Sequence, residues 1–188
     1  MYSLSESSSP QRYHPVAVLL HWVLGAALVA VFALGVYMHE LPFSPLRLQL
    51  YSWHKWAGVI LFALAFVRLA WRLTHRPPAL PASVAQAMPR WQHIAHHGTH
   101  HALYALFFAV PLLGWAFSSA AGFPVVLFAL WPLPDWVPVS EPLAEALKQA
   151  HKLAALGMGA LVILHVAAAL KHQLIDRDGL LARMGWGR

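Results

Sequence analysis

Two histidines, His151 and His165, stand fourteen residues apart in an apolar segment that is rich in alanine and glycine. On an α-helix this spacing is about 1400° of rotation, about 40° short of four full turns, and about 21 Å of rise. Both imidazoles therefore leave the same face of one helix, at two depths of a hydrocarbon layer about 30 Å thick. Because imidazole is a ligand for transition metals, this helix can present one ligand near each side of a membrane.

The partners of these histidines are predicted from the depths of other histidines. In helices that alternate in direction, His21 lies near the inner end of the first span, and His54 lies near the outer end of the second. His54 therefore shares a depth with His151, and His21 shares a depth with His165. Two histidines that clamp an iron from opposite sides are axial ligands of a haem, so the pattern predicts two haems stacked across the membrane.

Residues around the predicted ligands agree with this arrangement. Gly35 lies fourteen residues beyond His21, and Gly58 lies one turn past His54. At both positions a bare backbone would let a porphyrin approach. Arg68 lies fourteen residues beyond His54, at the depth of the inner histidine pair, where a haem propionate is its natural partner. The alternatives are that the glycines only allow close helix packing and that Arg68 extends to the membrane interface.

The elements that must hold these residues are membrane-spanning helices. Of the 188 residues, 59% are hydrophobic and 11% are charged, a balance typical of a membrane protein. Four apolar segments each approach the ~20 residues that a spanning helix needs. We therefore predict an all-α fold, an integral membrane four-helix bundle with two b haems. The predicted organisation is a flexible polar tail (1–14), a haem domain (15–174) with helices at about 15–38, 52–73, 100–120 and 148–172, and a basic C-terminal tail (175–188).

Composition excludes several other classes of protein. No cysteine is present, which excludes disulfides, iron–sulfur ligation and the covalent attachment of a c-type haem. The first apolar segment is too long for a cleavable signal, and its leader lacks a basic start. The net charge of +6 does not indicate nucleic-acid binding, because the basic residues fall at helix ends and not along one stripe.

Lysine and arginine residues beside the spans predict the orientation of the chain. With the N-terminus inside, the inner side holds nine of these residues and the outer side holds only Arg47, Lys55, Lys148 and Lys152. Both termini are therefore expected to lie in the cytoplasm.

A cluster of histidines precedes the third span. Its members recur at spacings of three and four, which places most of them on one face of a helix; they are His93, His96, His97, His100 and His101. They could bind a transition metal, cover propionates, line a quinone pocket or lie at the interface as ordinary polar residues. A histidine-rich metal-ion transporter is therefore an alternative from another functional class.

Taken together, these residues resemble the bacterial cytochrome b561 family. The resemblance is carried by His21-Trp22, His54 and the segments 147–172 and 178–184. It implies a four-helix protein with two haem b groups that exchanges electrons with membrane quinone. The implied axial ligands are His21, His54, His151 and His165.

Within that family the chain is similar to the superoxide oxidases of the bacterial inner membrane. This similarity implies that superoxide anion is the electron donor and that ubiquinone is the acceptor. Lys55 and Lys152 each follow an outer ligand directly, and Lys148 lies one turn before His151. A group of cations would attract superoxide and raise its encounter rate. The alternative is that these are ordinary surface lysines balanced by Glu141, Glu145 and Asp135.

The quinone site is expected beside the inner haem. Its candidate residues, which could also contact a propionate, are His97, His100, Arg72 and His172. A rival function keeps both haems in a cytochrome b subunit that relays electrons between quinone and a hydrogenase, a dehydrogenase or a periplasmic cytochrome. Such a subunit would need a redox partner protein in addition to lipid and quinone.

Overall fold

Helices make up most of the computed structural model, which describes residues 12–185. Within this range four helices are long and apolar enough to cross a membrane, which confirms the predicted all-α membrane fold. They are α1 (Pro15–Glu40), α2 (Pro45–Thr74), α4 (Arg90–Ala120) and α5 (Glu141–Lys171). The predicted flexible tail (1–14) falls mostly on residues 1–11, which lie outside the described residues, as do residues 186–188.

Three of the long helices begin well before the apolar segments that predicted them. The Ser44 hydroxyl accepts a hydrogen bond from the Arg47 N–H, and Pro45 fills the first turn, so α2 begins there. Ser140 caps α5 in the same way, and α4 begins at Arg90 directly after a proline. Hydropathy marks the part of a helix that lipid can cover, whereas capping residues decide where the helix begins.

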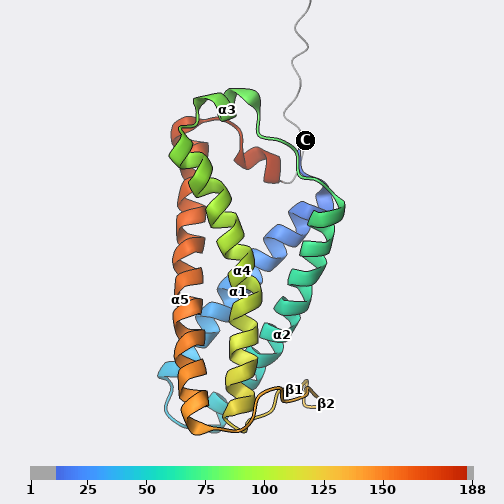
Figure 1. The fold of residues 1–188 in the computed structure, drawn as a ribbon, viewed down its shortest axis with the longest axis vertical. Coiled ribbons are helices and arrows are strands. Elements are labelled where there is room, and N and C mark those ends of the chain that lie inside the picture. Colours follow the sequence, from blue (N-terminus) through green and yellow to red (C-terminus); the bar gives the residue numbers. More distant parts are fainter. Residues whose placement is uncertain (1–11, 186–188) are drawn as a thin grey trace, which may run out of the picture.

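The long helices form an elongated bundle with distinct ends (Figure 1). Contacts are densest between α1 and α2 and between α4 and α5, and contacts between α2 and α4 join the two pairs. At one end lie the start of α1, the end of α5 and the short helix α3 (Ala82–Ala87). We call this the inner end, and we call the opposite end, which carries the strands, the outer end.

A small hairpin covers part of the outer end. Strand β1 (Val126–Leu127) pairs with β2 (Trp131–Pro132) in antiparallel register. Phe128 and Ala129 make the turn with positive φ angles of 53° and 59°. The Trp56 indole N–H donates a hydrogen bond of 2.7 Å to the Val126 carbonyl, which ties the hairpin to α2.

The residues predicted as a basic C-terminal tail fold back onto the bundle as far as residue 185. Beyond α5, a π-helical turn covers His172–Asp176, and Arg177 then takes a left-handed conformation with φ of 51°. Asp178 accepts a hydrogen bond from the Leu180 N–H at 3.1 Å. This turn directs the final 3₁₀ helix, Leu181–Met184, back toward the inner end.

Arg183 holds this segment in place and is only 3% exposed. Its guanidinium donates to the backbone carbonyls of Pro78 and Ala79 at 3.2 and 2.8 Å. The carbonyl of Met184 accepts a 2.8 Å hydrogen bond from the Trp22 indole. The segment therefore joins α1, the linker after α2 and the chain end.

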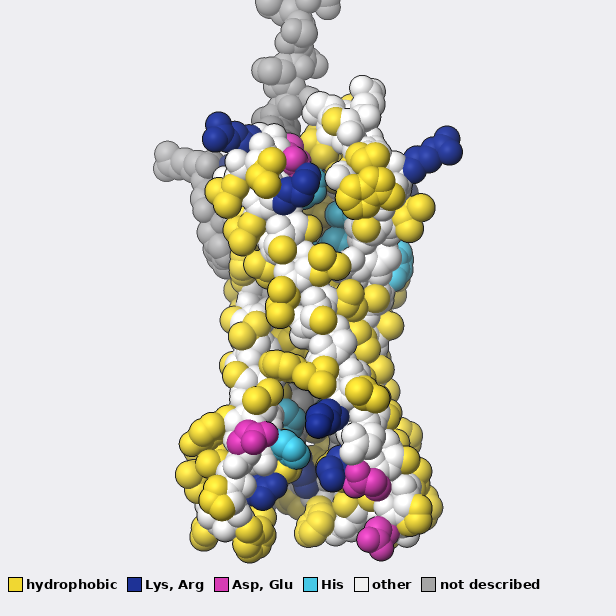
Figure 2. Space-filling view, turned by 90° about the vertical axis from the view of Figure 1, so that its left-hand side faces the viewer, with side chains coloured by type: hydrophobic (Ala, Val, Ile, Leu, Met, Phe, Trp, Pro, Cys, Tyr) yellow, Lys and Arg dark blue, Asp and Glu magenta, His cyan; other side chains and the backbone are white. Residues whose placement is uncertain are grey.

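The surface between the two ends is apolar. Figure 2 shows hydrophobic side chains over the waist of the molecule and charged side chains gathered toward both ends. Large apolar side chains point outward, including Val29 at 57%, Phe66 at 52% and Ile163 at 72% exposed. Lipid would cover such a surface, so the structure is that of a membrane protein.

Candidate functional site

Two pairs of histidine rings face each other inside the bundle. At the outer end, His54 of α2 and His151 of α5 have ring centroids 6.2 Å apart with an interplanar angle of 89°. At the inner end, His21 of α1 and His165 of α5 have centroids 6.1 Å apart at 70°. These are the pairs that equal depth predicts, and α5 contributes one ring to each.

Backbone groups hold the outer pair. The Nδ1 of His151 lies 2.9 Å from the Val110 carbonyl of α4, to which it donates its proton, and this leaves Nε2 free as a ligand atom. A Cβ at Gly114 would lie 3.0 Å from the Cε1 of His151, and one at Gly35 would lie 3.0 Å from the Cε1 of His54. Each ring therefore rests against a bare glycine backbone.

Polar side chains surround the inner pair. The Arg68 guanidinium donates to Nδ1 of His21 at 3.2 Å and to the Tyr104 hydroxyl at 3.1 Å. The His100 ring lies edge-on to His165, with centroids 5.1 Å apart. Because an accepting Nδ1 places the ring proton on Nε2, ligation through Nε2 of His21 requires Arg68 to move to another acceptor.

A spacing of fourteen residues recurs on the four long helices. Each helix places one residue of such a pair in an inner layer and the other in an outer layer. The inner layer is His21, Arg68, His100 and His165, and the outer layer is Gly35, His54, Gly114 and His151. Sequence reasoning missed Gly114, and its spacing from His100 is the signal that would have found it.

The residues present fit two haem groups. A metal ion about 2 Å from each imidazole nitrogen separates two ring centroids by about 6 Å, which both pairs satisfy. Among the described residues, Nδ1 of His54 is a buried atom without a hydrogen-bond partner, so this ring is not committed to a purely structural network. The chain has no cysteine, so any haem is held without thioether bonds.

The other residues predicted at the haems have different surroundings. A Cβ at Gly58 would meet nothing within 4 Å. On the quinone side, His172 donates to Asp178 at 2.6 Å, and the exposed His97 ring lies 5.3 Å from His96. His100 is therefore the candidate that the structure brings into contact with the inner pair.

The three lysines predicted to steer an anion are not equivalent. Lys55 donates to the Phe123 carbonyl at 3.0 Å, and Lys148 forms an ion pair with Glu145 at 3.1 Å. Within residues 12–185, Lys152 makes no hydrogen bond or ion pair, and it is exposed. Its charge is therefore the least compensated of the three.

The histidine cluster before the third span does not converge on a metal site. Within the described residues, the group of three metal-ligand side chains whose ligand atoms lie within 4.8 Å of one another is His172, Asp176 and Asp178. Lys171 forms a 2.5 Å ion pair with Asp176 in that group. The cluster instead lies along α4, where the ring centroids of His96 and His100 are 4.6 Å apart and their planes are tilted by 53°.

Comparison with known proteins agrees with this geometry. The family model described as prokaryotic cytochrome b561 matches residues 12–187. The chain is 31% identical to cytochrome b561 homolog 2 of Escherichia coli (strain K12) over 188 residues, which cover 96% of this chain and 95% of the relative. It is 29% identical over 179 residues to a protein of Yersinia pestis named probable superoxide oxidase CybB, with 93% and 96% covered.

Four spanning helices that enclose two facing histidine pairs define a membrane electron-transfer protein. The chain belongs to the prokaryotic cytochrome b561 family, whose members carry b-type haem.

Proposed function

We propose that the protein carries two haem b groups, oxidises superoxide at its outer end and reduces ubiquinone beside its inner end. The observation that carries this proposal is the pair of facing histidine couples, with one ring of each on α5. The name of the Yersinia pestis relative supports the choice of superoxide as donor. In the balanced reaction, two superoxide anions lose one electron each and become dioxygen, and one ubiquinone takes two electrons and two protons to become ubiquinol.

The protein side chains have distinct roles in this proposal. His54 and His151 would hold the outer haem, and His21 and His165 would hold the inner one. Haem iron held by these histidines would supply one-electron chemistry. Arg68 at the inner pair is proposed to meet a propionate, which would provide the new acceptor that it needs when His21 becomes a ligand.

The substrates are proposed to approach at opposite ends. Lys152 and Lys55, with a smaller part for the ion-paired Lys148, attract superoxide to the outer end by their charge. Ubiquinone is proposed to bind near His100, which touches His165, with His97, Arg72 and His172 as more distant candidates. Gly35 and Gly58 are proposed to face the outer haem.

The location that we propose is the bacterial inner membrane, with both termini in the cytoplasm. The inner end carries most of the lysine and arginine residues of the chain, as cytoplasmic segments of membrane proteins do. In this orientation superoxide from the periplasm reaches the outer end.

The decisive experiment supplies purified, haem-loaded protein with superoxide and a soluble ubiquinone analogue. We expect one ubiquinol for every two superoxide anions consumed, and reduction of two haems in stopped-flow spectra. Lys152→Gln and Lys55→Gln should slow haem reduction and weaken its dependence on ionic strength, because the attracting charge is lost. Lys171→Gln, at the inner end, is the matched control. If quinol reduces the haems but superoxide does not, the protein is a relay between quinone and another redox protein.

A further inference from the structure

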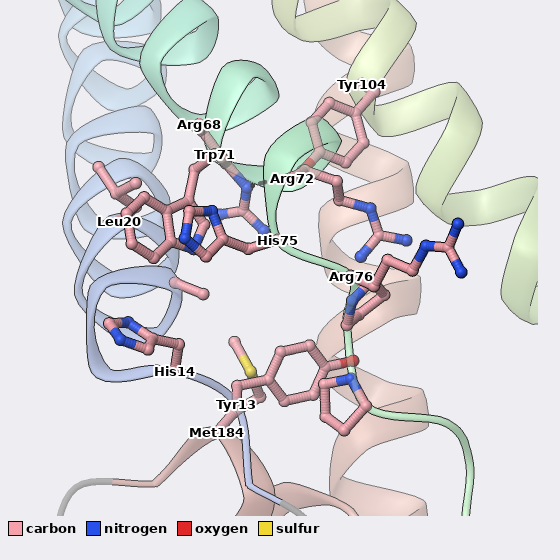
Figure 3. Close-up of a pocket in the computed structure, with 13 residues that line it drawn as sticks. Tyr13, His14, Leu20, Arg68, Trp71, Arg72, His75, Arg76, Tyr104 and Met184 are labelled. Carbon is pink, nitrogen blue, oxygen red and sulfur yellow. Dashed lines mark hydrogen bonds between the residues drawn. The ribbon is translucent and has the colours of Figure 1, made fainter.

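The inner end contains a cleft of which the proposed function uses only Arg68 and Arg72. It lies between the start of α1, the end of α2 and the returning C-terminal segment, and its volume is about 70 Å³ (Figure 3). We call it the inner cleft. Residues that line it include Tyr13, His14, Arg72, Arg76, Tyr104 and Met184.

Positive charge dominates the inner cleft. Arg68, Arg72 and Arg76 follow one another at steps of four residues, and none of the described residues that line the cleft is acidic. The Arg68 guanidinium already donates hydrogen bonds to His21 and Tyr104. In the described part of the chain, Arg72 and Arg76 make no hydrogen bond or ion pair, although their guanidinium groups project beside the cleft (Figure 3). Two charges with no acidic partner favour a bound anion.

The walls of the inner cleft are built from segments far apart in the sequence. Trp71 stacks on His75 with ring centroids 3.8 Å apart and planes within 2°, and His14 lies 5.0 Å from Trp71. On the other side, the buried Arg183 guanidinium lies 5.6 Å from the Tyr13 ring centroid. These contacts fix the shape of the cleft, so a ligand does not have to order it.

The cleft lies where the apolar belt ends. Leu73, next to Arg72, is 76% exposed, and Val67, six residues earlier on α2, is 53% exposed. Such side chains face hydrocarbon, whereas arginine and tryptophan at a helix end lie at headgroup level. A ligand that fits both features has an anionic head and an apolar body.

We propose that the inner cleft binds the headgroup phosphate of an anionic phospholipid. Arg72 and Arg76 donate hydrogen bonds to the phosphate oxygens, and the acyl chains lie along the exposed apolar side chains of α2. Basic pockets at the ends of spanning helices bind acidic lipid headgroups by this combination of charge and apolar contact. The proposal needs only the membrane position of the chain and does not depend on superoxide as substrate.

Lipid retention by the purified, haem-loaded protein tests this site. After delipidation in detergent, native mass spectrometry and thermal unfolding are measured with added phosphatidylglycerol or phosphatidylcholine. We expect phosphatidylglycerol to remain bound and to raise Tm, and phosphatidylcholine to do neither. The double variant Arg72→Gln/Arg76→Gln should lose at least about tenfold in phosphatidylglycerol affinity, because two charge-assisted contacts are removed. Arg90→Gln, an exposed arginine outside the cleft, is the matched control.

Several results would contradict the proposal that the inner cleft binds a phospholipid headgroup. The double variant could retain phosphatidylglycerol as well as Arg90→Gln does, or phosphatidylcholine could stabilise the protein equally. Inorganic phosphate alone could reproduce the full rise in Tm, which would assign the cleft to a free anion. Loss of haem Soret absorbance in the double variant with unchanged lipid retention would assign the arginines to haem propionates. None of these readouts uses superoxide, so the fate of the proposed activity is decided separately.

Discussion

At the scale of single residues, the two layers of the bundle differ in the groups that contact the histidine rings. In the outer layer His151 and His54 lie against bare glycine backbones. In the inner layer, Arg68 and His100 contact the rings of the other pair. The outer rings are therefore positioned by close packing and by one backbone acceptor, whereas the inner rings are positioned by polar side chains.

Replacing Gly114 should disturb the outer pair selectively. In Gly114→Val, the new Cβ would lie about 3.0 Å from the Cε1 of His151, so the branched side chain would push the ring away from its place against the Val110 carbonyl. If His151 holds one of two haems, as proposed, the Soret absorbance per protein should fall toward half. Gly98→Val, on the same helix and with nothing within 4 Å of its Cβ, controls for the lower helix propensity of valine. Equal haem content in the two variants would contradict this account.

At the scale of elements, the returning C-terminal segment connects the helices at the inner end by hydrogen bonds. Its residue Arg183 bonds to the linker after α2, and Met184 accepts from α1. Each partner lies more than 100 residues away in sequence, with a separation of 162 for the Trp22 contact. The segment therefore holds the inner ends of α1 and α2 to the end of α5.

Loss of the buried guanidinium should destabilise the whole protein. In Arg183→Gln two backbone carbonyls lose their donor, and each such loss costs about 1–3 kcal/mol when the acceptor stays buried. We expect a lower Tm for the purified protein in detergent. Arg177→Gln changes the same charge at an exposed position and should unfold near the wild-type temperature. A similar decrease of Tm in both variants would mean that the loss of a positive charge, and not the loss of the Arg183 hydrogen bonds, destabilises the protein.

At the scale of the whole molecule, the orientation in the membrane can be measured with single cysteines, because the chain has none of its own. Leu130 in the hairpin is 70% exposed at the outer end, and Ser83 in α3 is exposed at the inner end. In intact cells an impermeant maleimide should label Leu130→Cys at once and Ser83→Cys only after lysis. The reverse pattern would place the outer end, with its hairpin, in the cytoplasm.

Helix number and the pairing of histidines follow from sequence because both depend on long, regular periodicities. Apolar length sets the spans, and fourteen residues of rise set the two depths of His151 and His165. The same pattern marks Gly114, but a glycine after a proline in an apolar helix also has an ordinary interpretation as a kink. Its role becomes visible only when the His151 ring lies against it.

Other features depend on contacts that no local pattern contains. The acceptors of Arg183 are backbone carbonyls of the linker, and every residue offers such a carbonyl, so its burial leaves no signal in the sequence. The ion pair of Lys148 with Glu145 is different, because the two residues stand three positions apart on α5 and the sequence alone allows such a contact. The two depths of the histidine pairs are therefore predictable from the sequence, whereas the contacts of Arg183 are not.

The fixed charge of Arg68 has a consequence for an energised membrane. For an electron that travels in the proposed direction, the inner layer lies about 21 Å closer to the negative side, about two thirds of the hydrocarbon thickness. The transmembrane voltage opposes that step by about two thirds of ~2.3 kcal/mol for each 100 mV. A guanidinium beside His21 lowers the energy of negative charge at the inner layer, and the outer layer has no such cation among its members. The inner layer is thus suited to accept electrons against the voltage that respiration maintains.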